Sequence, residues 1–67
     1  MIESLSLRAA RINRNMTIEN AAAKVGLSAR QLYRLEAGET IPKWDIVVKL
    51  AEVYGYATDD LRIERKE

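Results

Sequence analysis

The stretch from residue 18 to residue 35, IENAAAKVGLSARQLYRL, constrains the fold more than any other part of the chain. It contains two short segments of helical period, separated by a turn with a single glycine, Gly26. The small side chain of Ala22 lets two helices cross closely, and Gly26 permits a backbone conformation that a Cβ would strain. The corner between the helices is closed by apolar residues at Val25, Leu32 and Leu35. This spacing predicts two helices packed at a fixed angle.

Residues that begin or end helices divide the rest of the chain in the same way. Ser28 and Gln31 form an S-x-x-Q capping box, which predicts a helix over residues 28–36. Thr17 is expected to cap the preceding helix, and Thr58 a last one in which Asp59 and Asp60 face the positive end of the dipole and Leu61 anchors the packing. Other breaks fall at Asn15, at Gly38 with Pro42, and at Gly55. We therefore expect an all-α fold of five short helices, beginning with residues 4–14, in a single domain over residues 1–67.

Composition favours a folded chain and argues against most enzyme chemistry. Hydrophobic residues make up 48% and charged residues 31%, which is outside the range of disordered chains. The chain has no Cys and no His, so a thiolate, an imidazole base and a zinc finger are all excluded. Asp59 and Asp60 are neighbours at an expected helix start, where caps are commoner than catalytic pairs. We expect no enzyme activity, no metal and no cofactor, and, with no apolar run near the ~18 residues of a membrane span, a cytoplasmic location.

Charge is distributed unequally along the sequence. Residues 1–34 hold six Lys and Arg against two acidic residues, a net charge of +4, whereas residues 35–67 hold five against eight, a net charge of −3. The whole chain has a net charge of only +1. The asymmetry is compatible with one face that docks on a polyanion, although a charge run is also what an ordinary solvated face presents.

Over nearly its whole length the chain resembles the Cro/C1-type helix-turn-helix domains, also called the Xre or lambda-repressor-like family. The resemblance rests on the spacing of Ala22, Gly26 and Leu32, on Leu35-Glu36-Ala37-Gly38, and on Pro42 followed by Lys49-Leu50-Ala51-Glu52, Gly55, Asp59 and Leu61. It implies a compact five-helix fold in which helices two and three form the helix-turn-helix. It also implies binding to double-stranded DNA at a palindromic operator, as a homodimer that forms on DNA or before it.

The family's base-reading positions fall on the outward face of the segment 28–36. The matching residues here are Ala29, Arg30 and Arg34, with Tyr33 beside them. Arginine can donate a bidentate pair of hydrogen bonds to guanine O6 and N7, so Arg30, Arg34 or both are expected to read guanine. Ala29 offers a methyl group to thymine, and Tyr33 can stack on a sugar or a base edge. The alternative for all four is an ordinary solvated helix face.

Phosphate contacts are expected on either side of that segment. They are assigned to the starts of the two helices and to the loop that follows: Thr17, Ile18, Ser28, Thr40 and Lys43. Ile18 departs from the polar residue that the family often has there. Glu39 would be repelled by phosphate, so either it points away or the loop contact is weaker than in relatives.

Three further expectations concern packing. The resemblance places Arg11 and Glu36 together as a partly buried ion pair that holds the recognition helix. Trp44 can lie against the DNA backbone or pack over the fourth helix, and packing is favoured. A dimer interface is expected in the more apolar C-terminal segment, at Tyr54, Tyr56, Leu61 and Ile63.

Together these features predict a transcriptional regulator of phage or bacterial type, a repressor that acts at the nucleoid. The alternative is a protein-interaction module, such as an antitoxin or anti-repressor component, that uses the same fold.

Overall fold

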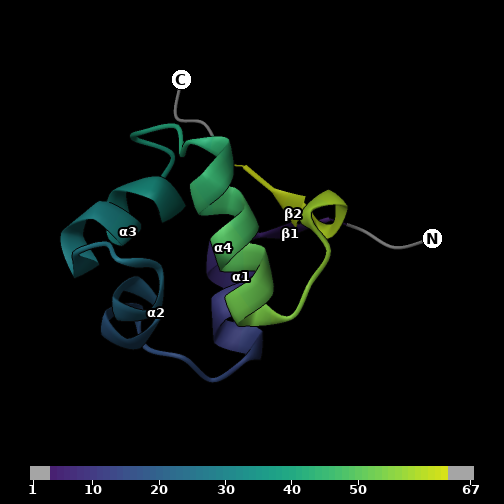
Figure 1. Ribbon diagram of the computed structural model, residues 1–67, viewed down its shortest axis with the longest axis horizontal. Helices are drawn as coiled ribbons and strands as arrows, with labels where there is room; N and C mark the ends of the chain where they lie inside the picture. Colours follow the sequence, from purple (N-terminus) through teal and green to yellow (C-terminus); the bar gives the residue numbers. More distant parts are fainter. Residues whose placement is uncertain (1–3, 64–67) are drawn as a thin grey trace.

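The computed structural model describes residues 4–63, which form four α-helices arranged around one core (Figure 1). Two very short strands and one 3-10 turn complete this part of the chain. In sequence order the elements are β1 (Leu5–Ser6), α1 (Leu7–Asn13), α2 (Ile18–Val25), α3 (Ala29–Glu36), α4 (Trp44–Tyr54), η1 (Thr58–Asp60) and β2 (Leu61–Arg62). None of the helices within residues 4–63 has the length and apolar character needed to cross a membrane.

The helix ends follow the local chemistry of the sequence. The Thr17 side chain accepts a hydrogen bond from the Asn20 backbone N–H, and Ser28 and Gln31 form the complete reciprocal capping box. Gly26 ends α2 in the left-handed conformation, with φ of +75°. Asn15 adopts the same region with φ of +57°, which confirms the break expected after α1.

The core is built mainly from small residues on α2 and large ones on α1, α3 and α4. Ala22 is 1% exposed, which agrees with its expected place where α2 and α3 cross, and α2 packs on both α3 and α4. The largest fully buried side chains are Leu7, Leu32, Leu50 and Tyr54. Because Leu32 and Leu35 both point into this core, the opposite face of α3 is left to solvent.

Residues 4–63 contain four α-helices where five were expected, and the structure departs from the expectation near both ends of this part of the chain. The Ser6 side chain accepts a hydrogen bond from the Ala9 N–H, so α1 begins at Leu7 rather than near residue 4. Thr58–Asp60 forms one 3-10 turn whose N-cap is Ala57 rather than Thr58. The flanking residues instead pair as parallel strands, Leu5 with Leu61 and Ser6 with Arg62. This pairing places Leu61 in the core, at 9% exposure, as the expected anchor but in extended backbone.

Two expectations about aromatic and apolar residues are also corrected. Trp44 does not pack over α4, because it is the first residue of that helix and 67% exposed. Side chains in a helix lean toward its N-terminus, so a side chain in the first position leans past the helix end. Tyr54 and Leu61 cannot serve a dimer interface in this fold, since both are buried in the chain's own core. Tyr56 and Ile63 are half-buried against the same core.

Candidate nucleic-acid interface

Helix α3 is anchored along one side and carries its cations on the other. Arg30, Tyr33 and Arg34 are exposed, Tyr33 by 60%, and Ala29 is half-buried. An α-helix with its side chains is about 10–12 Å in diameter, so a helix such as α3 fits the major groove of DNA, which is about 12 Å wide. Of the four residues proposed from the sequence as base contacts, Ala29 is the first residue of α3. The other three lie on the face of α3 that points away from the core.

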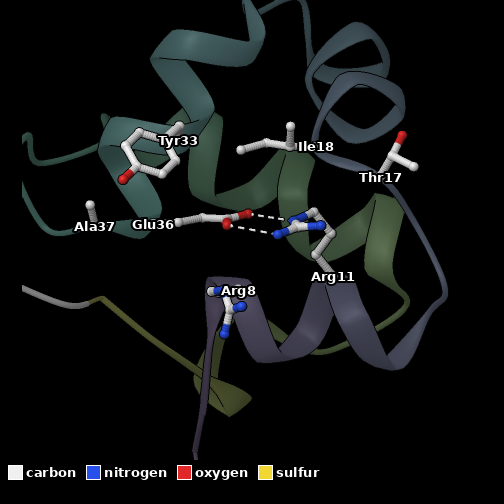
Figure 2. A pocket seen from close by; sticks show the side chains of 7 residues that line it. All are labelled: Arg8, Arg11, Thr17, Ile18, Tyr33, Glu36 and Ala37. Carbon is white, nitrogen blue, oxygen red and sulfur yellow. Dashed lines mark hydrogen bonds and ion pairs between the residues drawn. The ribbon is translucent and has the colours of Figure 1, made fainter.

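Arg11 and Glu36 form an ion pair that fixes the end of α3 against α1 (Figure 2). Arg11 Nε donates to Glu36 Oε2 at 2.7 Å and Nη2 donates to Oε1 at 3.1 Å. Nη1 donates to the Met16 carbonyl oxygen at 2.9 Å, so the same guanidinium also holds the turn before α2. The two side chains are only 13% and 4% exposed. The hydrogen bonds to Glu36 raise the pKa of Arg11, so the guanidinium stays protonated in the pair.

Tyr54 lies behind this ion pair in the core. Its hydroxyl group is buried and has no hydrogen-bond partner within residues 4–63. Burial, followed by the negative charge of Glu36, raises the pKa of Tyr54 to about 12. The phenol is thus held in its neutral form, and the Tyr54 side chain contributes to the core by packing.

An open groove of about 580 Å³ runs between α1, the start of α2 and one side of α3, with the Arg11–Glu36 pair in its wall (Figure 2). Its lining residues are Arg8, Arg11, Thr17, Ile18, Tyr33, Glu36 and Ala37. Thr17 and Ile18, two of the expected phosphate contacts, therefore line the same groove as Tyr33. The Thr17 oxygen already accepts the Asn20 N–H, which leaves its O–H free to donate.

Arg8 in this groove was missed by the sequence reasoning. It is exposed, and no acidic side chain within residues 4–63 pairs with it. In contrast, Arg14 is engaged in packing: its Nε donates to the Tyr54 carbonyl oxygen at 2.5 Å, and its guanidinium lies 4.5 Å from the centre of the Tyr56 ring. Arg8 and Arg11 are three residues apart and so share a helix face. That spacing was the available signal, but a solvated helix face carries the same residue types.

A second groove, of about 510 Å³, lies on the other side of α3, between that helix and the loop that leads to α4. Its lining includes Arg34 together with Thr40 and Lys43, the two loop residues expected to contact phosphate. Successive residues of a helix are about 100° apart, so Arg30 lies between the Tyr33 side and the Arg34 side. The structure thus arranges the expected phosphate contacts of α2 and of the loop on opposite flanks of the expected base contacts. Ser28, at the start of α3, uses its hydroxyl oxygen to accept the Gln31 N–H.

Glu39 does not point away from this face. Its carboxylate Oε1 lies 4.0 Å from Arg34 Nε, and the two side chains are 40% and 48% exposed. The one acidic residue of the loop is therefore adjacent to a proposed base-reading arginine.

Two short helices at a fixed angle, with the second standing out from the core, constitute a helix-turn-helix. A helix-turn-helix family model matches residues 7–61, most of the chain. The chain belongs to the Cro/C1-type helix-turn-helix family, a family of DNA-binding regulators that are generally not enzymes. There is no significant match to a curated protein or to a solved structure.

Proposed function

We propose that this chain is a sequence-specific double-stranded DNA-binding repressor that inserts α3 into the major groove. The observation that carries the proposal is the outward face of α3, where Arg30 and Arg34 stand on a helix fixed by the Arg11–Glu36 pair. A rigid support matters because base readout depends on the placement of a few donors to within fractions of an ångström.

Arg30 and Arg34 are assigned to guanine in this proposal, each through two hydrogen bonds to O6 and N7. Tyr33 lies at the edge of the groove that contains Thr17, where its ring can stack on a sugar or a base edge. Ala29 begins the helix and offers a methyl group to thymine. These roles give Arg30 and Arg34 most of the sequence preference, because their contacts are bidentate.

Phosphate contacts hold the register of the complex on both flanks of α3. Thr17 and the backbone N–H of Ile18 are assigned to one strand, and Thr40 and Lys43 to the other. Ser28 is assigned to phosphate at the start of α3. We add Arg8 to the first group, because it is an exposed cation that lines the same groove as Thr17.

The proposed complex is a homodimer on a palindromic operator. One chain of this size covers one half-site, and half-sites of helix-turn-helix dimers recur at about 34–36 Å along the duplex. A dimer that forms only on DNA fits the burial of Tyr54 and Leu61, which removes two of the four residues expected at a preformed interface.

Selection of bound duplexes from a random pool tests this function. The expected result is a palindromic sequence with guanine in each half-site and an affinity that falls steeply with salt. Arg34→Lys keeps the charge but loses the bidentate fork, so it should lose base preference by about 1–3 kcal/mol while general DNA affinity is retained. Arg34→Ala removes both the fork and the charge. Lys49→Ala is its matched control for the loss of charge, because Lys49 is exposed on α4 and lines neither groove. A pool that stays random at every salt concentration would refute the proposal and favour the protein-interaction alternative.

A further inference from the structure

The backbone after α3 returns Glu39 to the side of Arg34. The Gly38 N–H donates to the Leu35 carbonyl oxygen at 3.2 Å and the Glu39 N–H donates to the Arg34 carbonyl oxygen at 3.0 Å, which is the Schellman arrangement of a helix C-terminus. Gly38 adopts φ of +78°, the left-handed value that this arrangement requires. The position of residue 39 is thus set by main-chain hydrogen bonds, independently of its side chain.

The Glu39 side chain uses this position to approach the Nε side of the Arg34 guanidinium. At 4.0 Å the contact is electrostatic rather than a hydrogen bond, and within residues 4–63 Arg34 donates no side-chain hydrogen bond to a protein atom. The Nη groups of Arg34 are therefore available for an end-on bidentate contact with a base while the carboxylate stays beside Nε.

A swing of Arg34 toward a DNA phosphate would have the opposite consequence. Such a movement separates the guanidinium from Glu39 and leaves an unpaired carboxylate beside a polyanion. Phosphate contacts are made on any sequence, whereas the end-on contact with two acceptors is made only on guanine. The cost of the unpaired carboxylate therefore falls mainly on complexes with the wrong base.

We propose that Glu39 is a specificity-determining residue, whose carboxylate keeps Arg34 directed at a base and penalises its capture by phosphate. The inference rests on the proposed function, because it presupposes that Arg34 faces the major groove. It assigns to the loop acid a role that uses repulsion rather than attraction, since a protein discriminates between sites by a difference of affinities.

Glu39→Gln in the full chain tests this role, with Glu52→Gln as the matched control. Glu52 is exposed on α4 and lines neither groove, so its neutralisation changes the net charge equally. Binding is measured to the selected duplex and to a duplex in which the guanine assigned to Arg34 is replaced by adenine. Circular dichroism checks that both variants keep the wild-type fold.

Glu39→Gln is expected to tighten binding to the substituted duplex more than to the selected one, so that the ratio of the two affinities falls about two- to fivefold, the range of a half-exposed ion pair. Glu52→Gln should leave that ratio unchanged. The same substitution made in an Arg34→Ala chain should also leave the ratio unchanged, because the residue on which Glu39 acts is then missing.

Two results would overturn the role of Glu39 alone: an equal gain on both duplexes, or the same fall in the ratio without Arg34. A wild-type chain that shows no preference between any duplexes would instead refute the proposed function, and this inference with it.

Discussion

Removal of Arg11 should destabilise the fold far more than removal of any surface cation. Arg11→Met leaves the Glu36 carboxylate, which is 4% exposed, without its two hydrogen bonds from the guanidinium. Breaking a buried ion pair in this way typically costs about 3–5 kcal/mol, because an uncompensated charge remains in a poorly solvated site. A domain of this length has a free energy of unfolding of roughly 3–10 kcal/mol, from ~0.05–0.15 kcal/mol per residue. Arg11→Met should therefore abolish much or all of the stability.

The chain supplies its own control in a second Arg–Glu pair. Arg34 and Glu39 lie 4.0 Å apart and are about half exposed, so Arg34→Met should cost no more than about 1 kcal/mol. A double variant, Arg11→Met with Glu36→Met, removes both charges together. It should recover most of the loss, since apolar replacements of a buried pair are often neutral or stabilising.

Urea denaturation followed by far-ultraviolet circular dichroism measures these differences. Helix content is the suitable signal, because Trp44 is 67% exposed in the folded chain and its emission should change little on unfolding. The reasoning would be refuted if Arg11→Met cost as little as Arg34→Met, or if the double variant were no more stable than Arg11→Met alone. Either result would mean that solvent or other groups compensate Glu36 when the guanidinium is absent.

Three further predictions follow from individual residues. Arg8→Ala should reduce the slope of log affinity against log salt concentration by about 1 on every duplex, without a change of base preference. Lys49→Ala should leave that slope unchanged. Filter binding at several salt concentrations measures both slopes. Tyr54→Phe should be neutral or stabilising at pH 7, because it removes a buried hydroxyl that has no partner. The folded pKa of Tyr54 is raised from 10.0 to about 12, so the wild type should lose more stability than Tyr54→Phe as the pH rises through that interval. The difference should grow by at most ~1.4 kcal/mol per pH unit, measured from urea denaturation midpoints. Gly26→Ala should cost roughly 1–2 kcal/mol of stability because Gly26 has a left-handed backbone; no steric clash adds to this, since an added Cβ meets nothing within 4 Å. Gly26→Asn should cost less, because Asn tolerates that backbone better. Equal losses for the two variants in thermal melting would contradict this.

The ends of α1 and α2 and the starts of α2 and α3 were predictable because their chemistry is local. A capping box joins residues only three positions apart. Gly26 and Asn15 are of the residue types that most readily adopt a left-handed backbone, so the residue type alone indicates where a helix ends. The Arg11–Glu36 pair is separated by 25 positions, and only the resemblance to a known family pointed to it. No periodicity or propensity relates two side chains so far apart in the sequence.

The strands were not predictable by the same reasoning. Alternation of apolar and polar residues needs several positions to be detected, and β1 and β2 have two residues each. Apolar character also does not say what covers a residue. Tyr54 and Leu61 were expected to meet a second copy, but they fill the chain's own core, because the parallel pairing of Leu5 with Leu61 closes the fold over them.

The candidate site was only partly predictable for a related reason. The sequence shows where the arginines are, and each carries a guanidinium with forked donors. It does not show which of these guanidinium groups are already bound by other residues of the chain. Arg14 is engaged by Tyr54 and Tyr56, Arg8 is not paired within residues 4–63, and Arg34 has Glu39 beside it. These differences arise from how helices α1, α3 and α4 are placed relative to one another.

The pairing of β1 with β2 has a consequence for how this domain can be tethered. It brings Ser4 and Arg62, which are 58 positions apart, within reach of each other, since the Arg62 Nη1 donates to the Ser4 carbonyl oxygen at 3.4 Å. In Figure 1 the strand pair lies on one side of helices α1 and α4, and α3 lies on the other side of these two helices. Because the two strands run parallel, the chain enters β1 and leaves β2 at opposite ends of the pair, so a linker joined before Ser4 and one joined after Ile63 would leave the fold in different directions. Immobilisation through one end and through the other should therefore not be equivalent in how they present α3 to a duplex in solution.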